Sequence, residues 1–271
     1  MLRIYVIGAG HMGIAILLGL RAKNQKIQII GVDILDDRRK LLASHQIEAL
    51  PQLPALSPRD TVVIAIPPQE FISFSHSCTA LHGHPGLIVS VMAGIRMAVI
   101  AASLKVKQVV RAMPNTPSEV FEGVTVYCRA PELSEMNDRL VQQLLGVIGH
   151  FVAVDNEELI DTATALCGGG PAFFAYFADC MRQQAESAGF GRADASAIVI
   201  QLLRGTAILM SESGKSAMQL CREVMTPGGT TERGIDVFEE RKLRSIVEDA
   251  LSRSAQRSRE LGDSITITDE A

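Results

Sequence analysis

Tryptophan is absent from this 271-residue sequence, and aromatic residues make up only 4% of it. The sequence also lacks a tract of lysine and arginine, and its formal net charge is −4. Proteins that bind nucleic acids carry a concentrated positive patch, so we expect no nucleic acid as the main partner. The hydrophobic share of 47% and the charged share of 21% exclude a disordered chain. A globular protein with a small-molecule ligand is the expected class.

Paired cysteines are lacking as well. The five cysteines are scattered and form no Cys-x-x-Cys pair. This distribution is typical of reduced thiols and speaks against a disulfide framework or a zinc site. We therefore expect no bound metal.

Long uninterrupted apolar runs are also missing. The richest apolar segments, 159–181 and 195–210, are broken by charged residues, and the first also by glycines. Neither therefore qualifies as a membrane span. The first seven residues run directly into a glycine turn, which leaves no room for the apolar stretch of a secretory signal. The expectation is a cytoplasmic protein without a membrane anchor.

The N-terminal segment has the pattern of a strand, a glycine turn and a helix. An apolar run over 2–7 precedes Gly8-Ala9-Gly10-His11-Met12-Gly13, and helical apolar spacing follows. Glycines in this spacing form the dinucleotide-binding fingerprint: the first permits a tight turn, the second the approach of a pyrophosphate and the third close packing of helix on strand. The pattern predicts one half of a Rossmann fold.

The end of the second predicted strand, 27–32, bears on the choice of dinucleotide. Asp33 follows that strand, and an acid in this place commonly binds the ribose hydroxyls of NAD and repels the extra phosphate of NADP. NAD(H) is therefore favoured. The alternative is that Arg38 and Arg39 hold that phosphate, while Asp33 caps a helix over 37–44.

Further apolar runs predict parallel strands over 61–66, 87–91 and 108–112, and closing strands over 124–128 and 149–154. From residue 157 to about 262 only helical patterns follow. The sequence thus predicts an α/β protein, with a Rossmann-type dinucleotide-binding domain over 1–155 and an all-α domain over 156–271. The predicted cofactor-binding residues are Ile7, Gly8, Ala9, Gly10, His11, Met12, Asp33, Ala65, Ile66, Pro67, Pro68, Met92, Ala93 and Gly94.

A second glycine motif lies late in the chain, at Thr226-Pro227-Gly228-Gly229-Thr230-Thr231. Proline fixes one backbone dihedral and glycines permit positive ones, so successive N–H groups can turn inward where a helix begins. Such a turn suits a carboxylate or a phosphate. Alone, the motif favours an ordinary loop with an N-cap threonine; together with the N-terminal fingerprint it favours an anion site.

Taken together, these motifs resemble the pyrroline-5-carboxylate reductase family, which catalyses the last step of proline synthesis. The segments that match, in the family's order, are Gly8–Gly13, Ser90–Gly94, Arg111–Pro117, a glycine turn at Thr164–Ala172, and Thr226–Thr231. The resemblance spans nearly the whole chain. It implies a Rossmann domain and a helical domain that forms an interleaved homodimer, often assembled further into a ring of dimers.

The same resemblance implies an NAD(P)H-dependent imine reductase that converts 1-pyrroline-5-carboxylate to L-proline. The substrate carboxylate would bind the backbone at Gly229 and Thr230 and the hydroxyls of Thr226 and Thr231. Thr231 is the predicted catalytic residue, through a hydrogen bond to the imine nitrogen or to the water beside it. Glu157 is a lesser candidate for the cationic side of the ring. Asn115, in a rigid turn between two prolines, is also predicted to contact substrate.

The sequence departs from the family pattern at several positions. Pro67 stands where a lysine is common, while Gly169 and Phe173 replace a serine and a tyrosine of the glycine turn. Two alternatives therefore stay open. One is a reductase of another small imino or keto acid; the other is a dinucleotide-binding regulatory protein with little turnover. Cys167, in the same turn, is interpreted as a packing residue because hydride reduction needs no nucleophile.

Overall fold

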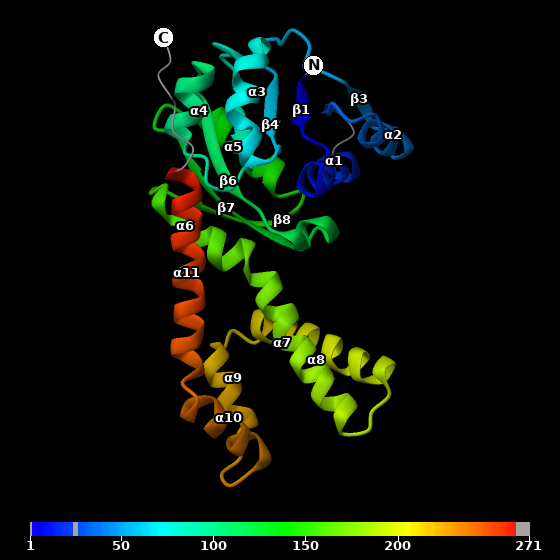
Figure 1. Cartoon of the computed structure of the whole chain (residues 1–271), viewed down its shortest axis with the longest axis vertical. Coiled ribbons are helices and arrows are strands. Elements are labelled where there is room, and N and C mark those ends of the chain that lie inside the picture. The colour runs from blue at the N-terminus through cyan, green and yellow to red at the C-terminus, as the bar shows by residue number, and fades with distance from the viewer. Residues whose placement is uncertain (1, 24–26, 264–271) are drawn as a thin grey trace. The chain divides into compact units, whose positions relative to one another are not determined.

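The structure, a computed structural model, describes residues 2–23 and 27–263. Two compact units divide these residues (Figure 1). The sheet unit runs up to Pro171 and resumes at Ser252, and the helical unit is Ala172–Leu251. Each unit is described below by itself.

An eight-stranded sheet forms the centre of the sheet unit, in the order β3-β2-β1-β4-β5-β6-β7-β8. The strands β1 to β6 pair in parallel, β7 is antiparallel to β6, and β8 is parallel to β7. The predicted Rossmann-type α/β architecture is confirmed. The strands are β1 Arg3–Ile7, β2 Gln28–Val32, β3 Glu48–Leu50, β4 Thr61–Ile64, β5 Ile88–Ser90, β6 Val109–Met113, β7 Gly123–Arg129 and β8 Gly149–Val154.

Helices cover both faces of this sheet (Figure 1). Successive residues of β1 alternate between two cores: Ile4 and Val6 pack with α1, α2 and α5, whereas Tyr5 and Ile7 pack with α3 and α4. A strand segment that is buried on both faces must be apolar, as residues Ile4–Ile7 of β1 are. The helices are α1 His11–Lys23, α2 Asp36–Ser44, η1 Pro68–Glu70, α3 Phe71–Ser77, η2 Thr79–Leu81, α4 Met97–Leu104, η3 Thr116–Val120 and α5 Glu135–Leu145.

The chain becomes helical after β8 but does not leave the sheet unit there. Helix α6, Glu158–Ala163, contacts β6 and β7, and the first segment of the sheet unit extends to Pro171. The domain boundary near residue 155 stays a prediction. The glycine turn expected over 164–172 was a wrong prediction. Residues Thr164–Gly168 form a π-helix, and α7, Gly170–Ser187, follows with Pro171 in its first turn, where proline is tolerated.

The helical unit consists of most of α7, then α8 Arg192–Glu212, α9 Ala217–Val224, α10 Thr230–Glu240 and the first part of α11 Leu243–Asp263. Among the helices of the described ranges, α8 alone is long and apolar enough to cross a membrane. Such a helix is weak evidence for a span, because a helix that packs against a second protein chain has the same composition. Large apolar side chains are exposed on it, Ile200 by 65% and Leu209 by 53%.

Candidate functional site

The turn between β1 and α1 has the geometry that the glycine fingerprint predicts. Gly8 has a φ of +92° and donates its N–H to Val32 O over 2.8 Å. A Cβ on Gly13 would lie 1.9 Å from Gly8 O, so only glycine lets α1 start this close to the strand. A Cβ on Gly10 would meet nothing within 4 Å. The side of the turn that a pyrophosphate would approach is therefore open.

Asp33 is tied to this turn. Its Oδ2 accepts the Ala9 N–H at 2.7 Å, and its Oδ1 accepts the Leu35 N–H at 2.8 Å. The carboxylate thus joins the ends of β1 and β2, and each oxygen keeps a lone pair that a ribose hydroxyl can reach. Leu35, which precedes the first residue of α2, is the N-cap of that helix. The acid therefore orders both the glycine turn and the entry into α2.

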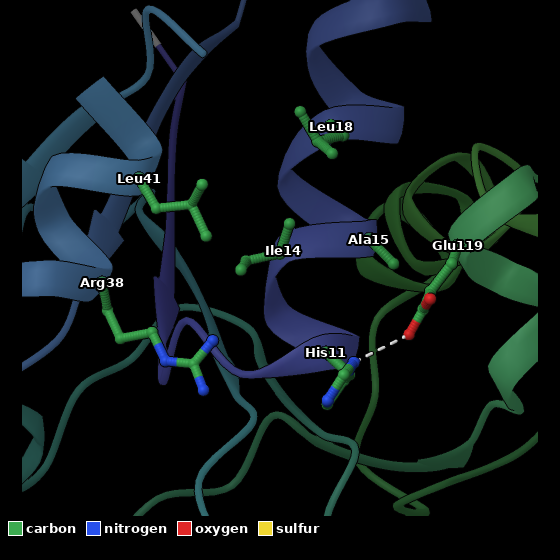
Figure 2. Close-up of a pocket in the computed structure, with 7 residues that line it drawn as sticks. All are labelled: His11, Ile14, Ala15, Leu18, Arg38, Leu41 and Glu119. Atoms are coloured by element: carbon green, nitrogen blue, oxygen red, sulfur yellow. Dashed lines mark hydrogen bonds and ion pairs between the residues drawn. The ribbon is translucent and has the colours of Figure 1, made fainter. Parts of the chain in front are cut away.

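The two arginines of the alternative interpretation have different surroundings. Arg39 donates to the backbone carbonyls of Asp33 and Ile34 and to Asp36 Oδ1, at 2.7 to 3.0 Å. Its guanidinium is therefore engaged with its own chain. Arg38 lines a pocket of about 330 Å³ beside α1 (Figure 2). Of the two, Arg38 is the one placed to meet an adenosine phosphate.

The pocket beside α1 also contains a contact between a histidine and a carboxylate that the sequence did not predict (Figure 2). His11 Nδ1 lies 3.0 Å from Glu119 Oε1, on the opposite side of the pocket from Arg38. The His11 side chain is 85% exposed. Because Glu119 lies 108 residues further along the chain, local spacing carried no signal of this contact. Apolar side chains of α1 and α2 complete the wall: Ile14, Ala15, Leu18 and Leu41.

Two further predicted turns lie at the carboxyl ends of neighbouring strands. The turn after β4 approaches the glycine turn closely, since a Cβ on Gly8 would lie 2.6 Å from Ala65 O. The adjacent residues Ile66, Pro67 and Pro68 lead into η1. The turn after β5 contains Met92 and Gly94, both buried, and Gly94 has a φ of +78°. Ligands of open parallel sheets bind at this edge.

Asn115 braces the turn in which it lies. Its Oδ1 accepts the Val124 N–H at 2.9 Å, its backbone carbonyl accepts the Ser118 N–H, and its side chain is buried, with 8% of the residue exposed. The amide oxygen is thus used within the sheet unit. A contact between Asn115 and substrate stays a prediction.

Glu157 takes part in a buried polar network. Its Oε1 accepts the Met97 N–H at 2.7 Å and Arg111 Nη1 at 3.2 Å, while Arg111 Nη2 donates to Asp161 Oδ1 at 2.8 Å. Arg111 is 1% exposed and Asp161 5%. This arrangement differs from the predicted contact of Glu157 with a substrate ring, because one of its oxygens is already shared by two donors. That substrate contact stays a prediction.

The late glycine motif forms a turn at the start of α10 in the helical unit. Gly228 has a φ of +73° and donates its N–H to Glu232 Oε2 at 2.6 Å. Gly229 donates its N–H to Thr226 O at 2.8 Å, so this predicted substrate donor already has an acceptor. The next N–H groups, at Thr230 and Thr231, belong to the first turn of the helix, where the helix itself provides no acceptor.

Cys167 has the surroundings of a packing residue. Burial raises the pKa of its thiol, and the residue lies in the π-helix between α6 and α7. A thiol with a raised pKa is a poor nucleophile at neutral pH. In the part of the chain that the structure describes, no three histidine, cysteine, aspartate or glutamate side chains are grouped as a metal site.

Comparison with known families matches both parts of the chain. Residues 157–261 match the family described as pyrroline-5-carboxylate reductase dimerisation, and residues 3–94 match NADP oxidoreductase coenzyme F420-dependent. A pyrroline-5-carboxylate reductase of Pseudomonas aeruginosa is 33% identical over 97% of this chain and 98% of the relative.

Solved structures are similar over almost the same length. A pyrroline-5-carboxylate reductase from Coxiella burnetii has 27% identity and a TM-score of 0.87, over 95% of this chain and 97% of that one. A Plasmodium falciparum pyrroline carboxylate reductase with NADP bound has 22% identity and a TM-score of 0.84, over 96% and 99%. The latter likeness supports the fold.

Proposed function

This chain belongs to the pyrroline-5-carboxylate reductase family, and we propose that it reduces the C=N bond of 1-pyrroline-5-carboxylate to give L-proline. The reduced nicotinamide of a bound NAD(P)H supplies the hydride. The residues of the β1–α1 turn fit the dinucleotide, because Gly10 leaves the approach open and Gly13 brings the first turn of α1 close to the strand.

The observation that carries the proposal is the turn before α10. A substrate with one carboxylate and one C=N bond needs an anion site that fixes its orientation, since rate then depends on alignment with the hydride donor. The N–H groups of Thr230 and Thr231 begin a helix, and the two threonines add hydroxyls to them. We assign the carboxylate to these groups and to the hydroxyl of Thr226.

The imine nitrogen must gain a proton when the C=N bond is reduced. An imine in water is already protonated in part, so the protein need not supply a strong acid. We place the Thr231 hydroxyl in a hydrogen bond to that nitrogen or to the water beside it, which orients the ring without a change of charge on the enzyme.

For the dinucleotide, we propose a preference for NAD(H). Asp33 accepts two backbone N–H groups, and its carboxylate would face the ribose of a bound dinucleotide. A second negative charge there, the phosphate of NADP, would be repelled. Arg38 is the group that would offset this repulsion if NADP(H) were used instead.

We also propose that the protein is a homodimer, with rings of dimers as the higher assembly. The support is the match of residues 157–261 to a dimerisation family and the exposed apolar side chains of α7 and α8. The proposed small-molecule partner is the imino acid substrate. We also propose a cytoplasmic location, because proline synthesis is a biosynthetic role.

Another small imino or keto acid is the second candidate substrate. The observation that favours it is the loss of polar side chains at Pro67, Gly169 and Phe173, each of which replaces a family lysine, serine or tyrosine. The carboxylate site would be retained in that case, and the remainder of the pocket would be less polar.

A direct assay separates these functions. Purified protein is mixed with NADH or NADPH and racemic pyrroline-5-carboxylate, and the nicotinamide absorbance is followed. We expect oxidation of the dinucleotide, faster with NADH. Oxidation only with a different imino or keto acid would support the second candidate. Binding of a dinucleotide without turnover on any of them would instead indicate a regulatory protein.

The variant Thr231→Val tests the assigned catalytic hydroxyl. It should retain the dinucleotide affinity of the parent and lose most of the catalytic efficiency, because valine keeps the shape and removes the hydrogen bond. Thr162→Val, at an exposed position of α6, is the matched control. Equal kinetics for the two variants would remove Thr231 from the reacting centre.

A further inference from the structure

The last turns of α11 pack against the turn after β5, residues 92–97, which we call the Gly94 turn. A Cβ on Gly262 would lie 2.5 Å from Gly94 O. Conversely, a Cβ on Gly94 would lie 3.3 Å from Gly262 N and 3.6 Å from Ser258 O. Helix and turn therefore meet backbone to backbone. A side chain at Gly262 would prevent this approach, and Gly94 also has a φ of +78°, which favours glycine.

A buried hydrogen bond secures this end of the helix. Ser258 Oγ donates to Asp161 Oδ1 at 3.2 Å, and the exposed fractions of the two residues are only 4% and 5%. The same aspartate oxygen accepts Arg111 Nη2 at 2.8 Å. Because all three side chains are buried, each depends on the others to satisfy its polar atoms.

The far end of the Gly94 turn is held by the same arginine. Arg111 Nη1 donates to Glu157 Oε1, which also accepts the N–H of Met97 at the start of α4. One guanidinium thus connects the two supports: Asp161 with Ser258 on one side, and Glu157 with Met97 on the other. The Gly94 turn is fixed at its middle by Gly262 and at its end by Glu157.

Helix α11 belongs to both units of the chain. The helix follows α10 after only Arg241 and Lys242, and the first turn of α10 carries the groups assigned to the substrate carboxylate. Its first residues belong to the helical unit, and residues from Ser252 on belong to the sheet unit. The residues of α11 that contact the Gly94 turn, Ser258 and Gly262, thus belong to the sheet unit together with that turn.

We propose that Ser258 and Gly262 are positioning residues for the reduction, which hold the Gly94 turn where the dinucleotide binds. This inference rests on the proposed function, since it takes Met92, Ala93 and Gly94 to be part of the predicted dinucleotide site. Neither residue touches the reacting atoms. Their effect comes from alignment, and a displacement of about 1 Å at a reacting centre costs up to about a hundredfold in rate.

The test compares Gly262→Ala and Ser258→Ala with the parent protein. Ser252→Ala, an exposed serine on the same helix, is the matched control. Dissociation constants for NADH and NADPH are measured by nicotinamide fluorescence, and kcat and KM by steady-state kinetics. The primary isotope effect is measured with dinucleotide deuterated at the transferred position.

We expect Gly262→Ala to weaken dinucleotide binding or lower kcat about tenfold. The KM for the imine should stay within about twofold, and the isotope effect should rise because hydride transfer becomes slower. Ser258→Ala should shift the same quantities by a smaller factor, and Ser252→Ala should leave them unchanged. A role in stability alone would not raise the isotope effect.

The proposal would be overturned if both Gly262→Ala and Ser258→Ala kept the dinucleotide affinity, the kcat and the isotope effect of the parent protein. If Gly262→Ala does not fold, as judged by circular dichroism, Ser258→Ala alone decides. The outcome is separable from the proposed function. A parent that binds NADH without reducing pyrroline-5-carboxylate would reject that function, while the binding constants of the variants would still test the positioning role.

Discussion

The sheet unit and the helical unit bury their apolar side chains to very different extents. In the sheet unit, Ile4, Val63 and Val89 are completely inaccessible to solvent. In the helical unit, Phe174 is 67% exposed and Ile200 65%. Soluble monomers rarely leave contiguous apolar surface of this kind uncovered. The comparison is consistent with the proposed homodimer, in which a second copy would cover the apolar side chains of the helical unit.

The polar groups of the two units also differ in where their partners come from. In the sheet unit, both Nη groups of the buried Arg111 bond to carboxylates of the same chain, while its Nε has no hydrogen-bond partner among the described residues. The turn before α10 instead leads into a helix whose first backbone N–H groups have no acceptor within the helix, and these are the groups that we assigned to a carboxylate. The carboxylates that pair with Arg111 in the sheet unit thus come from the same chain. Under the proposed function, the helical unit binds a partner chain and the substrate carboxylate.

The largest expected effect follows from breaking the internal network. Arg111→Met leaves Asp161 buried without a cation, and loss of one partner from a buried pair costs about 3 to 5 kcal/mol of unfolding free energy. The measurement is urea denaturation at a fixed protein concentration. Arg129→Met is the control, because Arg129 is 51% exposed in its pair with Asp138 and such pairs contribute about 0 to 1 kcal/mol. Similar losses in both variants would contradict the importance of burial.

A charge on the exposed face of α8 tests the proposed homodimer. Ile200→Asp should weaken self-association by about 2 kcal/mol or more, the scale of a central interface residue. Sedimentation equilibrium measures the dissociation constant. Met136→Asp, at a side chain that is 80% exposed in the first turn of α5, should leave it unchanged. An unaffected dimer in Ile200→Asp would place the interface elsewhere.

An effect of intermediate size is expected at Asp33. Asp33→Asn removes the charge from the hydrogen bonds to Ala9 and Leu35. It should raise the dissociation constant for NADH about tenfold, or 1.4 kcal/mol, and reduce the preference over NADPH. Fluorescence titration with both dinucleotides measures this, and Asp37→Asn, which is 98% exposed, is the control. A parent that binds NADPH more tightly than NADH would contradict the assignment.

The smallest effect is expected at Cys167. Burial raises the pKa of this thiol, so it remains protonated at neutral pH. Cys167→Ala should change kcat/KM by less than about twofold, because the side chain contributes packing only. A loss comparable to that of Thr231→Val would show that the thiol takes part in the chemistry.

Several elements were predictable because their signals are local. The glycine turn at Gly8 to Gly13 and the apolar strands around it carry their pattern within a few residues. The short edge strand β3 was missed, since Glu48 and Ala49 show no apolar alternation. The glycines near 168–170 were interpreted as a turn, yet they continue a helix, because Gly and Pro near a helix start do not necessarily end it.

Residue patterns were sufficient to specify the α/β class, the glycine fingerprint and the glycine turn before α10, because each depends on neighbours in the chain; anion binding at that turn stays a prediction. Folding in three dimensions was needed to bring Arg111 to Glu157 and Asp161, which lie 46 and 50 residues away, and Ser258 to Asp161 across 97 residues. Contacts of this kind leave no periodicity in the sequence. They form only where packing excludes water and makes each buried polar atom dependent on a distant partner.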